Sequence, residues 1–168
     1  MSNTPHIRFA TIDDLPKIVE IYNQAIKLKR ATGDTDEFSV KERVEWFYKF
    51  STNEYPIYIA EIENEIAGYA TLSPYRKGRK AMSKIAEISF YLEYSYRGLG
   101  IGSALVNHVI LDCKRINKET LLAILLDINK DSIKLLKKFN FEQWGHLPNI
   151  ISFDAIKCGQ FIYGLNLI

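Results

Sequence analysis

The sequence predicts an α/β domain with a mixed central sheet, in the order β-α-α-β-β-β-α-β-α-β-β. Three observations support this prediction. A strand-like run at 85–92 leads through three closely spaced glycines into an amphipathic run at 103–116. Residues 121–127 are continuously apolar, which is typical of a strand covered on both faces. Two strand-like segments within 57–72 flank a tight turn, which indicates an antiparallel pair.

The chain opens with a short predicted strand at 7–10, followed by a helix. Apolar residues recur at three- and four-residue spacing from Leu15 onward, which predicts a helix that ends before Gly33. Thr11 or Asp13 supplies its N-cap, since either side chain can accept a hydrogen bond from the first turn.

A polar, turn-rich loop at 31–36 leads to a second predicted helix. Residues 39–42 form a capping box, so this helix runs from there to about Phe50. Three of its apolar residues are expected to face the core: Val44, Phe47 and Tyr48.

Three strands then follow, at 57–62, 66–72 and 84–92, with a tight turn between the first two. A basic loop over 75–80 separates the second strand from the third. The antiparallel strands are followed by a crossover to the parallel strand at 121–127. Strands that part at this crossover leave a cleft for a thin, extended ligand.

The helix after the glycines has one apolar stripe. A last helix begins at Asn129 and ends near Asn140, and closing strands are predicted at 144–147 and 161–167. Residues 148–159 show no clear pattern. The stripe comprises Ile101, Leu105, Val109, Cys113 and Ile116.

Length and composition predict a single domain over residues 1–168, with 47% hydrophobic residues and a net charge of +2. This balance does not indicate a nucleic-acid groove. The first nine residues lack the apolar core of a signal sequence, and no apolar run is long enough to span a bilayer. We therefore expect a cytoplasmic protein with neither a nucleic-acid partner nor a membrane partner.

Cysteine and histidine usage indicates neither disulfides nor a metal site. Cys113 and Cys158 are expected to be reduced core thiols. His6, His108 and His146 lie far apart without metal-ligand spacing, so we expect no metal.

The glycine loop is the strongest functional signal, because a glycine-rich turn before a helix exposes backbone N–H groups to an anion. A P-loop requires a lysine before its last serine or threonine, and Gly102 is followed directly by Ser103. A dinucleotide fingerprint requires a third glycine where Ser103 stands. The pattern Arg-x-x-Gly-x-Gly, filled by Arg97, Gly100 and Gly102, resembles the acetyl-CoA loop of the GNAT N-acetyltransferases. A glycine-rich turn without a ligand is the alternative that the loop alone leaves open.

Segments along nearly the whole chain resemble the GNAT fold, and within it the phosphinothricin acetyltransferase-like branch. The matching pieces, in order, are Ile7–Thr11, Asp14–Pro16, Ile21–Asn23, Ala31–Thr32, Asp34–Thr35, Ala67–Ala70, Pro74–Arg76, Glu87-x-Ser89-x-Tyr91, the glycine loop, Asn129-x-x-Ser132–Ile133 and Phe141.

This resemblance implies acetyl-CoA as the donor and a small-molecule amine as the acceptor. It implies that the glycine loop holds the pyrophosphate through backbone amides, and that the end of the preceding strand and Asn129 bind the pantetheine arm. Asn129 is also a common type of helix N-cap, and both roles are compatible. The implied cofactor-binding residues are Tyr91, Leu92, Glu93, Arg97, Gly98, Leu99, Gly100, Ile101, Gly102, Ser103 and Asn129.

Glu87 is the candidate general base, because a charge within an otherwise apolar strand is costly unless it is paired or used. The family's base falls at this position, and a solvent-facing strand glutamate is the alternative. Backbone N–H groups near Leu92 are the expected oxyanion donors. Neither cysteine is placed as a nucleophile, so we expect direct transfer.

One position departs from the family pattern. Many GNAT enzymes have a tyrosine on the last helix that protonates the leaving thiolate, and the phosphinothricin branch often has a histidine there. Leu136 stands at that position and cannot donate a proton. A thiol has a pKa of about 8.5, so its anion can leave with help from water, Tyr91 or Tyr94.

Arg76 is the main candidate for acceptor binding, with Tyr75 beside it, because a guanidinium can bind a carboxylate through two hydrogen bonds. An exposed arginine in a basic loop is the alternative. Thr32 and Asp34 are weaker candidates, since turn chemistry alone explains them.

Three functions remain open from the sequence. The leading hypothesis is N-acetylation of a small amino-acid analogue such as phosphinothricin or methionine sulfoximine. The second is acetylation of a polyamine, an aminoglycoside or a protein N-terminus. The third is a catalytically weak acyl-CoA-binding module. The closing strand, rich in apolar residues at 161–165, is consistent with the homodimers that the branch often forms.

Overall fold

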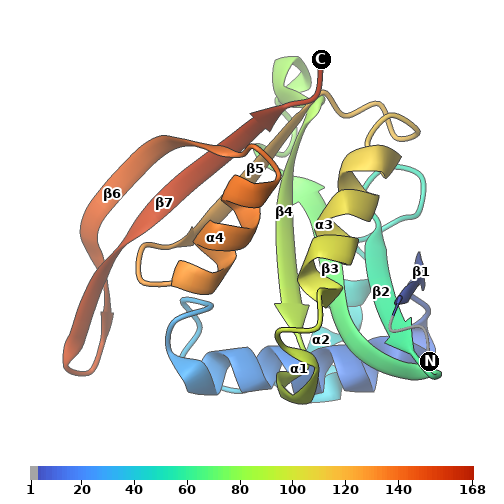
Figure 1. The fold of residues 1–168 in the computed structure, drawn as a ribbon, viewed down its shortest axis with the longest axis horizontal. Coiled ribbons are helices and arrows are strands. Elements are labelled where there is room, and N and C mark those ends of the chain that lie inside the picture. The colour runs from blue at the N-terminus through green and yellow to red at the C-terminus, as the bar shows by residue number, and fades with distance from the viewer. Residues whose placement is uncertain (1–3) are drawn as a thin grey trace.

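The computed structural model describes residues 4–168 and confirms the predicted fold class and element order (Figure 1). The predictions of one domain over 1–168 and of no signal sequence within the first nine residues include residues 1–3, which lie outside the described part. The strands are β1 (His6–Phe9), β2 (Ile57–Ile62), β3 (Glu65–Pro74), β4 (Ile85–Leu92), β5 (Thr120–Leu126), β6 (Glu142–Phe153) and β7 (Ile156–Asn166). The main helices are α1 (Leu15–Leu28), α2 (Val40–Phe47), α3 (Ile101–Asp112) and α4 (Lys130–Lys138).

The strands form one mixed sheet in the order β1-β2-β3-β4-β5-β7-β6. Every neighbouring pair is antiparallel except β4 and β5, which are parallel. The parallel pairing covers only Ile85–Glu87 of β4 against Thr120–Leu122 of β5. The two strands therefore part beyond Glu87, as the mixed order predicts.

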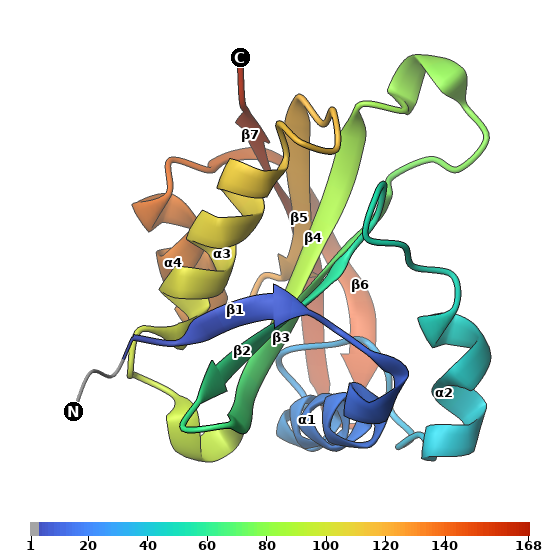
Figure 2. The same cartoon turned by 90° about the vertical axis from the view of Figure 1, so that its right-hand side faces the viewer.

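Helices cover both faces of the sheet (Figure 2). Helices α3 and α4 pack on one face over the larger apolar core, whereas α1 and α2 pack on the other face over a smaller cluster. The apolar stripe predicted for the helix after the glycines is buried in the larger core from Ile101 to Ile116. Within residues 4–168, no helix is both long enough and apolar enough to cross a membrane.

Helix α2 has the predicted capping box but ends earlier than expected. The Glu42 N–H donates to Ser39 Oγ (3.3 Å), and the Ser39 N–H donates to the Glu42 carboxylate (2.7 Å). The helix ends at Phe47, after which the chain makes tighter turns. The prediction that Tyr48 faces the core is wrong, because these turns take it off the helical stripe and leave it 67% exposed.

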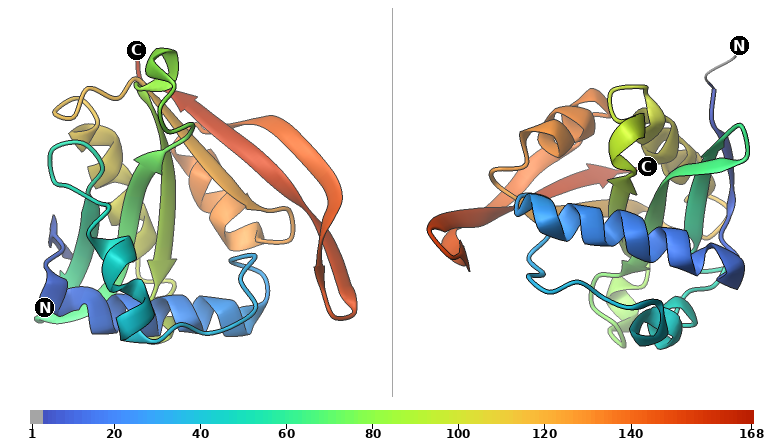
Figure 3. Two further views of the ribbon diagram at one scale, coloured as in Figure 1. Left: turned by 180° about the vertical axis from the view of Figure 1, so that it is seen from behind. Right: turned by 90° about the horizontal axis from the view of Figure 1, so that it is seen from below.

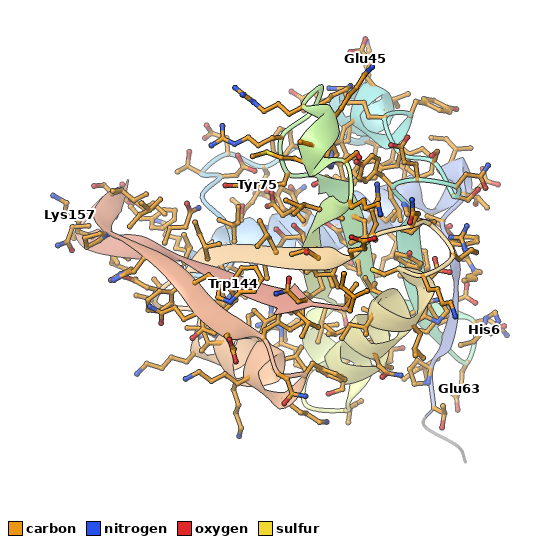
Figure 4. The ribbon with its side chains drawn as sticks, turned by 90° about the horizontal axis from the view of Figure 1, so that it is seen from above. His6, Glu45, Glu63, Tyr75, Trp144 and Lys157 are labelled. Atoms are coloured by element: carbon orange, nitrogen blue, oxygen red, sulfur yellow. The ribbon has the colours of Figure 1, made fainter. Side chains whose placement is uncertain are left out.

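Strands β6 and β7 form a long hairpin that extends away from the body of the sheet (Figures 1 and 3). Residues 148–159, which have no sequence pattern, make up its far half. The register shifts between Gln143 and Gly145 and again between Leu147 and Ile151, so the alternation of side chains is broken twice. Figure 4 shows Lys157 near the far end of this hairpin.

Candidate functional site

A cleft of about 600 Å³ lies where β4 and β5 part; we call it the glycine-loop cleft. The end of β4, the glycine loop, the start of α3, the start of α4 and the end of α1 line it together. Its lining residues are Ala25, Leu28, Arg30, Ala31, Phe90, Tyr91, Leu92, Arg97, Gly98, Gly100, Ile101, Gly102, Ser103, Asn129, Asp131, Ser132, Lys134 and Leu135.

The glycine loop has the geometry of an anion cradle. Gly98 and Gly100 have φ angles of +76° and +83°, a region that L-residues with a Cβ rarely adopt. A Cβ at either position would meet no protein atom within 4 Å, so the space outside them is open. Gly100 is the N-cap of the twelve-residue helix α3 and provides no side-chain cap, so first-turn N–H groups remain for a ligand. A pyrophosphate therefore fits this site.

Gly102 has a different role from the other two glycines. A Cβ there would lie 2.8 Å from Leu135 Cδ2, so this glycine lets α3 approach α4 closely. Leu99 is 47% exposed and does not line the cleft. In this motif, Gly98 and Gly100 allow the backbone conformation of the loop, and Gly102 allows the close packing of α3 against α4.

At the end of β4, successive backbone N–H groups point alternately toward β3 and toward the glycine-loop cleft. The Glu93 N–H donates to Ala67 O (3.0 Å), so it faces β3 and not the cleft. Because successive N–H groups of a strand point to opposite sides, the Leu92 N–H faces the cleft. The Glu93 carboxylate accepts hydrogen bonds from Gln24 and Ser95. Of the three strand-end residues expected to bind pantetheine, Tyr91 and Leu92 line the cleft and Glu93 does not.

Asn129 caps helix α4, since its Oδ1 accepts a hydrogen bond from the Ser132 N–H (3.3 Å), and it also lines the cleft. Sequence reasoning missed two cations that line the cleft beside Arg97: Arg30 and Lys134. The lysines along the predicted helix after Asn129 could have indicated Lys134. No sequence pattern indicated Arg30, because it lies in the loop that follows the end of α1. These cations favour a polyanionic ligand.

Glu87 lies on the α1-facing side of β4, together with the alternate residues Ser89 and Tyr91. Its neighbours Ala86 and Ile88 are buried in the core beneath α3. The Glu87 side chain is half-buried, and no side chain within residues 4–168 forms a hydrogen bond or ion pair with it. Burial raises the pKa of its carboxyl group. Such a carboxylate is a stronger base than a solvated one.

The loop after α1 is fixed by Tyr22. The Tyr22 hydroxyl lies 2.8 Å from Thr32 Oγ1 and donates to Asp34, and the Tyr22 ring packs edge-on against Tyr91 (5.1 Å between centroids). Burial, and then the hydrogen bond to Asp34, raise the pKa of Tyr22 to about 12. Thr32 is 9% exposed and lines neither this cleft nor the second one described next. The Thr32 hydroxyl is already hydrogen-bonded to the Tyr22 hydroxyl.

A second hollow of about 590 Å³ lies between α2 and the loop after β3; we call it the basic hollow. Arg76 lines it, and the Arg76 guanidinium lies 5.4 Å from the Tyr75 ring. Tyr75, which is labelled in Figure 4, does not line it. Ser73, the register partner of Glu87, also lines it. Glu87 itself lines neither hollow, but it stands on β4 opposite Ser73 of the basic hollow and four residues before Tyr91 of the glycine-loop cleft. The charged residues of the basic hollow are Lys49, Arg76, Lys77, Arg79, Lys80 and Glu54.

The residue at the position of the family's acid and the two tyrosines expected to assist the leaving thiolate are placed differently. Leu136 is 1% exposed and packs in the larger core, away from the cleft lining. Tyr94 is 65% exposed, with Arg97 over its ring. Tyr91 lines the cleft. In the part of the chain that the structure describes, no three His, Cys, Asp or Glu side chains cluster as metal ligands.

The parallel strands of this open α/β sheet part beside an anion cradle. This arrangement defines a class of proteins that bind a cofactor with a thin arm and an anionic group. Residues 17–141 match the model of the acetyltransferase (GNAT) family. The chain belongs to this family and is an acetyl-CoA-dependent N-acetyltransferase.

Relatives support the resemblance to the phosphinothricin branch. YwnH of Bacillus subtilis, provisionally described as a phosphinothricin acetyltransferase, is 34% identical over 96% of this chain and 98% of its own length. An L-methionine sulfoximine/L-methionine sulfone acetyltransferase of Salmonella typhimurium is 26% identical over 93% of this chain and 88% of its own. The structure of a phosphinothricin acetyltransferase from Sinorhizobium meliloti in complex with acetyl-CoA superposes with a TM-score of 0.91 at 27% identity, covering 97% of this chain and 88% of that one.

Proposed function

We propose that this enzyme transfers acetyl from acetyl-CoA directly to the amino group of a small amino-acid-like molecule of the phosphinothricin or methionine sulfoximine type. The observation that carries the proposal is the position of Glu87. Its side chain is half-buried and has no hydrogen-bond or ion-pair partner in residues 4–168. Glu87 shares a face of β4 with Tyr91 of the glycine-loop cleft and is paired across the ladder with Ser73 of the basic hollow.

The glycine-loop cleft holds the donor in this proposal. First-turn N–H groups of α3 bind the pyrophosphate, and Arg97, Arg30 and Lys134 supply positive charge around it. The Leu92 N–H faces the cleft and is the candidate donor to the thioester oxygen. Asn129 lies across the cleft at the start of α4, where its amide can contact the pantetheine arm while it caps the helix.

Glu87 removes the proton from the acceptor ammonium, directly or through one water. An alkyl ammonium has a pKa near ~10, so only a small fraction is free amine at neutral pH without a base. Burial raises the pKa of Glu87 toward that of the amine, which reduces the energy difference for proton transfer. The free amine then attacks the thioester carbon, and no acyl-enzyme forms.

The acceptor enters from the basic hollow, where Arg76 binds its carboxylate in a bidentate manner. The relatives named for L-methionine sulfoximine and phosphinothricin acetylation support an acceptor of this class. Acetylation of a polyamine is the second candidate function. Five cations against one carboxylate in the hollow disfavour a polycationic acceptor.

Free-thiol release from acetyl-CoA across a panel of amines tests the proposal. We expect turnover with phosphinothricin or methionine sulfoximine and little with spermidine; release with spermidine alone would assign a polyamine acceptor. Absence of release with phosphinothricin and with methionine sulfoximine would contradict the proposed acceptor class. Arg76→Gln should raise KM for the amino acid about tenfold or more and change kcat little, because a charged hydrogen bond to the acceptor is lost. Lys77→Gln is the matched control in the same loop.

A cytoplasmic homodimer remains part of the proposal. The apolar residues of β7 that first indicated an interface face inward in part, since Tyr163 is 2% exposed. Four exposed apolar residues lie on the projecting hairpin: Trp144, Leu147, Ile150 and Ile156. Light scattering of the purified protein would test the dimer: a monomer at micromolar concentration contradicts it.

A further inference from the structure

We propose that Tyr91 is a catalytic residue, and that its hydroxyl returns to the coenzyme A sulfur the proton that Glu87 takes from the acceptor amine. The inference rests on the proposed function and extends it. It answers a question posed by Leu136, whose buried alkyl side chain lies where many family members have an acid.

Polar side chains line the β3–β4 ladder between Glu87 and Tyr91. Glu87, Ser89 and Tyr91 alternate along β4 and so share one face, and their register partners across the ladder are Ser73, Thr71 and Tyr69. None of these six side chains has a hydrogen-bond partner within residues 4–168. Thr71 is nevertheless only 6% exposed. No side-chain oxygen within residues 4–168 is both fully buried and unpartnered, so the unpartnered oxygens of this strip reach open space where water or ligand can bind them.

Among tyrosines near this strip, the structure favours Tyr91. The Tyr22 hydroxyl is already bonded to Thr32 and Asp34. Tyr69 is 1% exposed and does not line the glycine-loop cleft, and Tyr94 is 65% exposed on the surface. Tyr91 lines the cleft next to Leu92, whose N–H faces the same space.

The chemistry has the form of a relay. Burial, and then the neighbouring Tyr22, Asp34 and Glu87, raise the pKa of the Tyr91 phenol, so it stays protonated but is a poor acid by itself. It can donate only while it accepts a proton in return. The acceptor ammonium first loses one proton through Glu87 to water. As the C–N bond forms and the C–S bond breaks, a second N–H proton passes to the Glu87 carboxylate. That proton moves through Ser89 or a water to Tyr91, as the Tyr91 O–H proton moves to sulfur. The Glu87 carboxylate is regenerated, and the products are the amide and the free thiol.

The decisive experiment measures the pKa of the coenzyme A thiol in its binary complex with the protein, from the ultraviolet absorbance of the thiolate. If Tyr91 donates a hydrogen bond to sulfur, Tyr91→Phe should raise that pKa by about one unit, a tenfold change in acidity. Tyr69→Phe, which removes the hydroxyl of the register partner across the ladder, should leave it unchanged. A Tyr91→Phe complex with an unaltered thiol pKa and turnover within twofold of the parent would overturn the inference.

Two further results keep this inference separate from the proposed function. If the parent protein binds coenzyme A but acetylates no amine, the proposed function fails, whereas the thiol titration still tests the hydrogen bond. If Tyr91→Phe does not fold, a proton inventory on the parent enzyme in mixtures of light and heavy water replaces it. A curved inventory is expected for several protons in motion, and a linear one would refute the relay.

Discussion

Replacing Glu87 by glutamine should make the protein more stable and much less active. The substitution keeps the shape of the side chain and removes only its charge. Burial raises the pKa of the Glu87 carboxyl group, so the charged form is less favourable in the folded state than in the unfolded state. Glutamine is neutral at every pH and avoids this cost.

The change in stability depends on pH, and the change in kcat has a size expected for the loss of a general base. A group whose folded pKa is raised favours folding below its unfolded pKa, about 4.3 for glutamate, and this advantage disappears as the pH rises through the folded value. At pH 7 the variant should therefore be more stable than the parent and unfold at a higher Tm. Loss of a general base should lower kcat by about 10²-fold or more, equivalent to about 2.7 kcal/mol in the barrier.

Thermal unfolding at pH 7 and at pH 4, with steady-state thiol release at pH 7, checks both effects. The stability gain should shrink at pH 4, where the Glu87 carboxyl group becomes largely neutral in both the folded and the unfolded parent protein. The Kd for acetyl-CoA should change little. Glu45→Gln, on the exposed side of α2, is the control and should alter neither property. Equal turnover in Glu87→Gln and the parent would remove Glu87 from the mechanism, and a lower Tm at pH 7 would refute the burial argument.

Two glycine substitutions test the backbone requirements. Gly100→Val should weaken coenzyme A binding at least 100-fold by filling the cradle, and lower the free energy of unfolding by about 1–2 kcal/mol through its φ of +83°. Calorimetric titration checks this, with Gly33→Ala as the control, and normal affinity would contradict the cradle. Gly164→Ala should cost about 1–3 kcal/mol, because its Cβ would lie 2.0 Å from the Trp144 ring. Denaturant unfolding measures that loss, and an unchanged midpoint would show that Trp144 moves aside freely.

Local patterns predicted the element order because most of this fold is amphipathic on a regular period. The stripe of α3 from Ile101 to Ile116 is one example. The tight turn after β2 is another, since Glu63 and Asn64 both have positive φ, as a two-residue hairpin turn requires. Tyr48 was misplaced because the end of α2 is set by tertiary packing, and an apolar pattern continues past it.

The β6–β7 hairpin was unpredictable over 148–159 for two physical reasons. Its register shifts interrupt the two-residue period, and the edge strand β6 is mostly exposed, so it carries little hydrophobic signal. Pro148 also suggests an interruption, yet an edge strand can accommodate a proline because one side of it needs no ladder hydrogen bonds. Strand β6 is therefore held by backbone pairing with β7 and by a small apolar cluster in which Phe153 and Cys158 pack with Leu126.

The two halves of the site differ in how far sequence determines them. The cradle consists of consecutive residues, so one motif predicts it. The acceptor side joins the end of helix α2 and the loop after β3, and only folding brings these together. β4 connects both halves: its Leu92 end faces the glycine-loop cleft, while Glu87 is paired with Ser73 of the basic hollow. A change of acceptor can therefore evolve in the loops around the basic hollow while the donor cradle and the base on β4 remain fixed.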